Sequence, residues 1–494
     1  MSGIRMGLWT IHRVLGTGIA FLVVLWFGSG AVLLFAPYPS LNEEERFRWL
    51  EPLQLDRCCV PLELVWNQVG LTQGVERIRL VMSFGRPVYV IHFLDGTLKS
   101  LSADQSELMS EITQHDAVQT TQQGQMFGVG STVETIWDDR WTVHQRFDAH
   151  RPLRKISWHD SEGTEWYLSS TTGELVMDTT AFERQWNTVG AVVHWLYVPI
   201  LRRHWTLWDH TVWWLAATSL ITAMSGLVLG TQGFLRDQRQ RPTHSFSGMK
   251  RWHYRGGMTI GAVVCTWLFS GLLSMDHGRW FSPGEPTVDQ RQRFMGGPLV
   301  PEDIGVSLAD AVRQVQSGPV VKEVFLMKVG GESYYVFRSS PEQQVVMSAM
   351  TVREAEPTVS RDTLSRGVNT MIPARQIDQR ALAQGDLYYY STAHHPRPRA
   401  AVRIIVDDPA QTWVHIDTKT GHLIELMDAR GRLYRWLFHG LHSWDIPWLL
   451  DHDPQRKLVL LGLCVTGFLF SLSGVYLGIA VLVRWARSSP PRIL

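Results

Sequence analysis

Two histidine pairs recur at one spacing in distant parts of the chain. Residues 192–204 read VVHWLYVPILRRH and residues 440–452 read GLHSWDIPWLLDH, so both fit the template His, four residues, Pro, four residues, His. A neutral imidazole nitrogen is a common ligand of iron, zinc and copper. The repeated template therefore predicts metal-binding histidines that act as equivalents. The first candidates are His194 and His442, and the alternatives are His204 and His452.

Four apolar stretches are long enough to cross a bilayer, which needs about 20 residues of helix. They cover residues 14–36, 211–231, 256–275 and 457–483. The 494-residue chain also has 22 tryptophans, a residue that collects at membrane–water interfaces. A formal net charge of +1 gives no electrostatic basis for binding nucleic acid. These features predict a multi-pass protein in contact with membrane lipid.

Basic residues indicate the orientation in the membrane, because cytoplasmic loops carry an excess of Lys and Arg. Arginines and lysines crowd the short loop between the second and third stretches and flank both ends of the chain. We therefore expect both termini and that loop to be cytoplasmic. The expected segments are a first span within 1–36, an outside region at 37–210, a span at 211–234, a basic loop at 235–252, a span at 253–275, a second outside region at 276–456, a span at 457–484 and a tail at 485–494.

The two halves of the chain resemble each other. Placing His12 on His253 aligns the first and third spans without a gap, and placing His194 on His442 does the same for the second and fourth. Both alignments superpose Ser-Gly pairs, at 29–30, 270–271, 225–226 and 473–474. The sequence predicts two parallel two-helix repeats related by an axis along the membrane normal.

The outside regions also correspond. PLELVWNQVG and SLADAVRQVQ each precede strand-like runs, and WYLSSTTGELV matches WVHIDTKTGHLIEL around a Thr-Gly turn. We expect each outside region to form small α+β modules on its helix pair. The predicted fold class is thus a membrane α-helical protein with α+β domains outside the cytoplasm.

A symmetric pair of imidazoles suits haem, whose iron accepts two axial nitrogens on nearly equivalent faces. His12 and His253 begin spans at the cytoplasmic edge, while His194 and His442 precede spans at the outer edge. We therefore expect two b-type haems, one near each face. Two alternatives stay open: ligation of His194 with His204 within one half, and zinc, although catalytic zinc usually draws three protein ligands to one point.

Two haems would carry electrons across the membrane to an acceptor held outside. The chain has no strand–GxGxxG–helix unit for a nicotinamide or flavin. The electron donor would then be a cytoplasmic reductase or membrane quinol. The Ser-Gly pairs would let a flat macrocycle, or a neighbouring helix, approach closely.

Several motifs together resemble those of the PepSY-associated transmembrane proteins. They are the helix starts IHRVLG and WHYRGG, the turns STTGELVMD and IDTKTGHLIEL, the segment LYYY at 387–390, and LH before a last helix with Ser-Gly. The resemblance covers nearly the whole chain. It departs at DDRWTVH (138–144), which lacks the tyrosine run, and at Val193, where the motif has Leu.

The resemblance implies an activity. Characterised members are ferric-siderophore reductases of the bacterial inner membrane, which bind haem b and pass electrons to periplasmic ferric complexes. It places the haem ligands at His12, His253, His194 and His442. Two other classes remain open: a non-enzymatic PepSY protein that binds a peptide or regulates a protease, and a transporter of the iron complex.

Residues of the outside regions are weaker candidates for contact with a ferric chelate. Histidines cluster near the duplicated Ala-His motif, although solvated loop histidines are the simpler explanation, and tyrosines in strands usually belong to a core. The candidates are His144, His150, His394, His395 and Tyr389. Cys265 and Cys464 are expected to pack as small apolar side chains within spanning helices. Disulfides between neighbouring cysteines are strained and rare, so Cys58 and Cys59 are not expected to form one.

Overall fold

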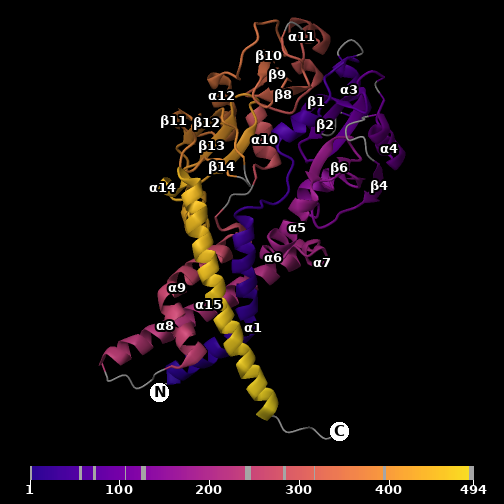
Figure 1. Ribbon diagram of the computed structural model, residues 1–494. Coiled ribbons are helices and arrows are strands. Elements are labelled where there is room, and N and C mark those ends of the chain that lie inside the picture. The colour runs from indigo at the N-terminus through magenta and orange to yellow at the C-terminus, as the bar shows by residue number, and fades with distance from the viewer. Residues whose placement is uncertain are drawn as a thin grey trace. The chain divides into compact units, whose positions relative to one another are not determined.

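The computed structural model describes residues 3–54, 58–70, 74–105, 107–123, 130–239, 246–281, 285–315, 318–392 and 396–488. The chain forms two compact units, each built from several segments (Figure 1). The helical unit contains residues 1–38, 183–282 and 430–494, and the sheet unit contains residues 39–182 and 283–429.

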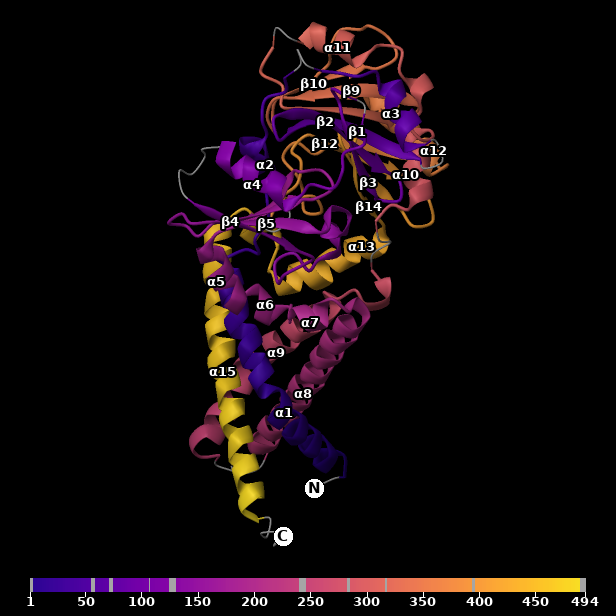
Figure 2. The same cartoon turned by 90° about the vertical axis from the view of Figure 1, so that its right-hand side faces the viewer.

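Four helices of the helical unit are long and apolar enough to cross a membrane, as predicted. They are α1 (Gly3–Leu33), α8 (Trp205–Arg239), α9 (Gly248–Leu273) and α15 (Asp453–Ser488). Helix α1 packs along α15 and α8 packs along α9, as Figures 1 and 2 show. Buried apolar side chains fill the space between the helices, among them Phe27, Val264 and Trp267.

The spacing that the two His-Pro-His stretches share has a local structural cause. After His194, which ends α6 (Ala191–His194), the chain turns at Leu196 with a left-handed φ of 52°, and Trp444 turns in the same way with φ 51°. Proline then begins a short helix in each stretch, since its missing N–H costs nothing at a first helical position. These helices are α7 (Pro199–Arg202) and α14 (Pro447–Leu450).

Other short elements complete the helical unit. They are α5 (Ala181–Val189), the 3₁₀ turn η2 (His277–Arg279), α13 (Ala429–Tyr434) and the π-helix η4 (Arg435–Gly440). Single π-helical turns are rare and often lie at functional sites. Here η4 lies directly before the segment that carries His442.

The largest sheet combines strands from both outside regions in the antiparallel order β10-β9-β8-β1-β2-β3. The strands are β1 (Val75–Ser83), β2 (Arg86–Phe93), β3 (Leu98–Ser102), β8 (Glu323–Val329), β9 (Glu332–Arg338) and β10 (Gln344–Ser348). Strand β1 joins β8, with Ile78 opposite Leu326 and Leu80 opposite Val324. The sequence did not predict this sharing, because alternating strands do not specify which region supplies their partner.

The six-stranded sheet packs one face on an apolar core with α3 (Leu62–Val69) and α11 (Leu308–Val315). The same type of hydrogen bond occurs twice beside this core, once in each half of the chain. The hydroxyl of Tyr89 donates to the carbonyl of Val60 at 3.0 Å, and the hydroxyl of Tyr335 donates to that of Val306 at 3.0 Å.

The sheet unit also contains two four-stranded meanders. In each, the predicted Thr-Gly turn joins the last two strands, with Gly173 and Gly421 at φ 72° and 68°. One contains β4 (Ser131–Ile136), β5 (Leu153–Trp158), β6 (Glu165–Ser169) and β7 (Leu175–Thr179). The other contains β11 (Gln376–Ala381), β12 (Ala401–Val406), β13 (Trp413–Asp417) and β14 (Leu423–Met427). The remaining elements are α2 (Glu43–Trp49), α4 (Gln114–Gln123), η1 (Gln145–His150), α10 (Val288–Met295), η3 (Pro301–Asp303) and α12 (Arg361–Met371).

A buried carboxylate lies where β1, β8 and β9 meet. Glu323, whose side chain is 0% exposed, accepts bonds from Arg46 at 2.8 Å and Arg338 at 2.7 Å and lies 3.4 Å from Arg79. Burial alone would raise the pKa of Glu323, but the three guanidinium groups outweigh it and hold the pKa at about 2. The carboxylate is therefore a charged centre of the sheet unit.

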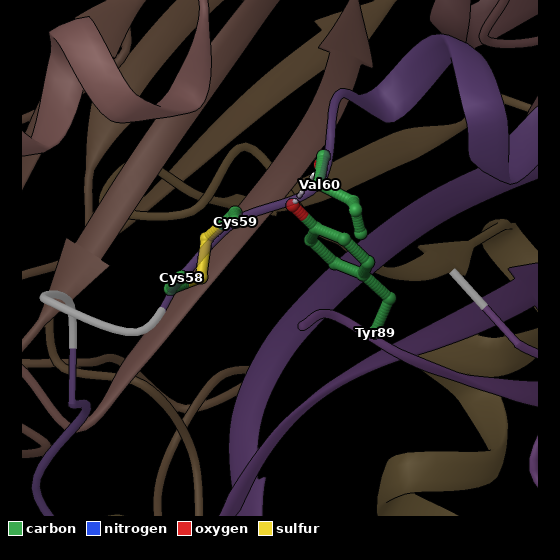
Figure 3. The surroundings of a disulfide bond; sticks show 4 residues. All are labelled: Cys58, Cys59, Val60 and Tyr89. Carbon is green, nitrogen blue, oxygen red and sulfur yellow. Dashed lines mark hydrogen bonds between the residues drawn. A yellow bond between two sulfur atoms is a disulfide. The ribbon is translucent and has the colours of Figure 1, made fainter. Parts of the chain in front are cut away.

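The cysteine pair of the sheet unit differs from expectation. Cys58 and Cys59 form a disulfide in the loop before α3, so the rarer alternative holds (Figure 3). Both side chains are half-buried against the core of the six-stranded sheet. The backbone of Val60, the next residue, is fixed by Tyr89 and by a bond from its N–H to the carbonyl of Ala103 at 2.8 Å. Cys265 and Cys464 are free thiols in spanning helices, as expected.

Candidate functional site: two facing histidine pairs

The structure brings the four predicted histidines together as two pairs. The ring centroids of His12 and His253 are 6.2 Å apart, and those of His194 and His442 are also 6.2 Å apart. His12 and His253 lie near the first residues of α1 and α9, whereas the other pair contacts the last turns of the same helices. The two pairs thus lie near opposite ends of α1 and α9.

The spacing within each pair fits two axial ligands of one metal. Metal–imidazole bonds are about 2 Å long, so two opposite ligands place their ring centroids about 6 Å apart. Simple ring–ring contact covers a range of about 4.5–7 Å, so the distance alone does not distinguish the two arrangements. The hydrogen bonds of the other ring nitrogen provide a second observation.

Every one of the four rings has its Nδ1 engaged by a neighbouring helix. His194 is 3.0 Å from the hydroxyl of Ser29, and His442 is 3.1 Å from that of Ser270. His253 is 2.8 Å from the hydroxyl of Ser473, and His12 is 2.9 Å from the carbonyl oxygen of Thr222, with Ser225 at 3.4 Å. The serines are those of the duplicated Ser-Gly pairs.

These bonds favour a proton on Nδ1 of each ring. The carbonyl of Thr222 can only accept, so His12 donates from Nδ1. The hydroxyls of Ser29 and Ser270 lie within reach of the carbonyls of Trp26 and Trp267, to which they can donate while they accept from the histidines. Ser473 has the same relation to Phe470. In this arrangement Nε2 of each ring is the acceptor, which is the form that a metal ligand needs.

The glycine of each Ser-Gly pair lies against a histidine ring, and at Gly226 the contact is too close for a side chain. A Cβ on Gly226 would lie 2.5 Å from Cε1 of His12. At Gly30, Gly271 and Gly474 the corresponding distances, to the rings of His194, His442 and His253, are 3.4, 3.5 and 3.5 Å. From the sequence, these glycines were expected to allow a macrocycle or a neighbouring helix to approach closely. In the structure, the groups that approach them include the histidine rings.

We expect Gly226→Ala to displace the His12 ring, because the added methyl group would overlap it. On the sequence-based expectation of one haem per histidine pair, haem content should fall from about two to about one per chain, since ligands need placement within about 0.5 Å. The haem-to-protein ratio of purified protein measures this. Gly18→Ala, on α1 with no heavy atom within 4 Å of its Cβ position, is the matched control and should keep full content.

The alternative outer ligands have other surroundings. His204 is exposed before α8. His452 is 2.8 Å from the carbonyl oxygen of Trp448 through Nδ1, and its ring stacks on that tryptophan with centroids 4.8 Å apart. Neither has the serine contact that the other four histidines share.

The outside candidates do not gather at one place in the part of the chain that the structure describes. His144 is exposed and caps η1, accepting from the N–H of Arg146 at 3.1 Å. His150 is half-buried, 3.0 Å from the hydroxyl of Ser169, and burial lowers its pKa. Tyr389 is 2% exposed and donates to the carbonyl of Pro398. His394 and His395 lie outside the described residues.

Sequence reasoning missed one cluster. Asp209, His210 and His277 bring three ligand atoms within 4.8 Å of one another at the outer-pair end of α8 and α9. Asp209 and His210 are adjacent, but His277 lies far along the chain, so only the pairing of α8 with α9 brings them together.

Comparison with known proteins yields no relative from which a function could be transferred. No protein-family model matches the chain, and no curated protein matches it. The site must therefore be interpreted from its own geometry.

Proposed function

We propose that this membrane protein is a haem-bearing transmembrane reductase of the bacterial inner membrane. It passes electrons from a cytoplasmic reductase or quinol to an acceptor outside, a ferric siderophore or another ferric chelate. The observation that supports the proposal is the two facing imidazole pairs, in which Nδ1 of every ring is hydrogen-bonded to a neighbouring helix.

The protein would hold one b-type haem between His12 and His253 and another between His194 and His442. The bound haems supply one-electron iron chemistry. The chain's own residues orient the ligands through Thr222 and the four serines, and surround them with apolar helices. From His12 to Ser29 helix α1 rises about 25 Å, at about 1.5 Å per residue, which is most of the roughly 30 Å hydrocarbon core.

Constant residue offsets between the two halves support the proposed duplication. Helices α3 and α11 are displaced by 246 residues at both ends, as are the Tyr89–Val60 and Tyr335–Val306 bonds. Strands β5 to β7 and β12 to β14 are displaced by 248, which is also the offset from His194 to His442.

Two observations support the proposed orientation. The basic loop between α8 and α9 favours the cytoplasm. The sheet unit contains the Cys58–Cys59 disulfide, and disulfides persist in oxidising compartments such as the periplasm. Both support an orientation with the sheet unit outside the cytoplasm.

The test is a reduced-minus-oxidised spectrum of the purified full-length protein together with its haem-to-protein ratio. We expect a b-type spectrum and about two haems per chain. Mixing the reduced protein anaerobically with a ferric chelate should reoxidise it. A colourless protein that binds peptide would instead support the PepSY binding class, and uptake into vesicles without reductant would support a transporter.

A further inference from the structure

We propose that Asp209, His210 and His277 form a binding site for one divalent first-row transition metal ion. The inference does not rest on the haem proposal, since it uses none of the four paired histidines. Two imidazole nitrogens and one carboxylate oxygen lie within 4.8 Å of one another, so one ion can contact all three.

The side chains of the cluster already contact one another. Nδ1 of His277 is 2.6 Å from Oδ2 of Asp209, and the ring centroids of His210 and His277 are 5.0 Å apart. In the absence of metal, His277 and Asp209 are joined by this hydrogen bond, and a bound ion would take its place.

The backbone around His277 is shaped to point this residue back toward α8. Asp276 has φ 40°, Gly278 has φ 73° and Arg279 has φ 54°. Left-handed non-glycine residues are strained and persist only where their surroundings hold them. The carboxylate of Asp276 accepts the N–H of Phe281 at 2.9 Å and closes the turn.

The ligand set indicates the class of metal. Two histidines and one carboxylate with open positions are typical of non-haem Fe²⁺, and three protein ligands plus water are typical of Zn²⁺. Asp209 and His277 are partly buried, with side chains 14% and 27% exposed, while His210 is exposed. Solvent can therefore reach the open positions.

The cluster lies beside the outer histidine pair. Trp208, next to Asp209, donates its indole N–H to the carbonyl of Trp195 at 2.9 Å, and Trp195 follows His194. The ring of Trp213, one turn further along α8, has its centroid 5.3 Å from that of His277. An ion in this site would therefore be held at the same end of the helical unit.

Equilibrium dialysis of full-length, EDTA-treated protein against buffered Zn²⁺, and anaerobically against Fe²⁺, tests the proposal by elemental analysis. The wild type should bind one more ion per chain than the Asp209→Asn/His277→Ala variant. Its affinity should be at least about 10-fold higher. His204→Ala, which removes an exposed histidine just before α8, should bind as the wild type does. Equal binding by the wild type and the double variant would overturn the site.

A second measurement needs no variant. Zn²⁺ should protect His210 from diethylpyrocarbonate, as mass spectrometry of the wild type would show, while His204 remains reactive. Reaction of His210 at an unchanged rate would contradict the proposal. Zinc in the protein as isolated identifies a resident ion, and binding only of added metal identifies an exchangeable one. Both outcomes support the site, and the haem spectrum checks the other proposal separately.

Discussion

Replacing His442 with alanine is expected to remove the proposed outer haem and leave the proposed inner one. Haem content should fall to about half, because one imidazole then remains where two are needed for axial ligation. His12 and His253, near the other ends of α1 and α9, keep their bonds to Thr222 and Ser473. Electron transfer from the reduced protein to an external ferric chelate should slow strongly, because in the proposed function the outer haem is the last carrier before the acceptor.

Three companion variants sharpen this result. His194→Ala should give the same loss, since it removes the partner ring 6.2 Å away. His452→Ala should leave the haem content unchanged, because that ring stacks on Trp448. Added imidazole, which can enter the cavity left at position 442, should restore part of the spectrum. Full haem content in both His194→Ala and His442→Ala would exclude the outer site.

Replacing Glu323 with glutamine is expected to destabilise the sheet unit by about 3–5 kcal/mol, the usual cost of breaking a buried ion pair from one side. The change leaves Arg46, Arg79 and Arg338 without their shared carboxylate. The unfolding temperature of the sheet unit in the full-length protein should fall on the order of 10 °C. Glu43→Gln is the matched control. Glu43 also pairs with Arg46 and Arg338, but its side chain is 55% exposed, so its loss should cost about 1 kcal/mol or less.

The same carboxylate predicts a dependence on pH. The folded pKa of Glu323 is about 2, below the ordinary value of 4.5. Its stabilising contribution is therefore complete well above pH 4.5 and is lost as pH falls from 4.5 toward 2. The loss should reach about 3 kcal/mol, and Glu323→Gln should lack this component. Unfolding temperatures at pH 7 and pH 3 for both proteins measure the difference. An equal fall in unfolding temperature for the wild type and Glu323→Gln would show that Glu323 is not the group responsible for the pH dependence.

The sequence predicted the spanning helices well because a long apolar run has few alternative structures. It also predicted that His194 would face His442, since equal positions in two repeats must meet at equal depth. The serine bonds could have been recognised from the repeated Ser-Gly pairs, but the rotation of each helix about its axis was needed to show that Ser29 meets His194. The sequence thus showed the repeated Ser-Gly pairs, but it did not show which histidine each serine contacts.

Other features had no sequence signal of their own. His277 joins Asp209 only through helix pairing and a left-handed turn, which neither spacing nor composition encodes. The pairing of β1 with β8 was likewise invisible, because each strand offers the same alternating pattern to any edge. The disulfide between Cys58 and Cys59 was not expected, because such bonds are rare in general. That general frequency does not describe a particular loop that packs against a core.

The shared six-stranded sheet has a consequence for biosynthesis. Strand β1 must wait for its second partner, β8, which is made more than 240 residues later, after the two long apolar helices α8 and α9 have been synthesised. Until then β1 has one open edge, and open edges invite pairing with other chains. Assembly of this sheet must also close a very long loop, which slows folding. The nascent first half is therefore the stage at which this protein is most vulnerable to aggregation, and at which a chaperone that covers strand edges would help most.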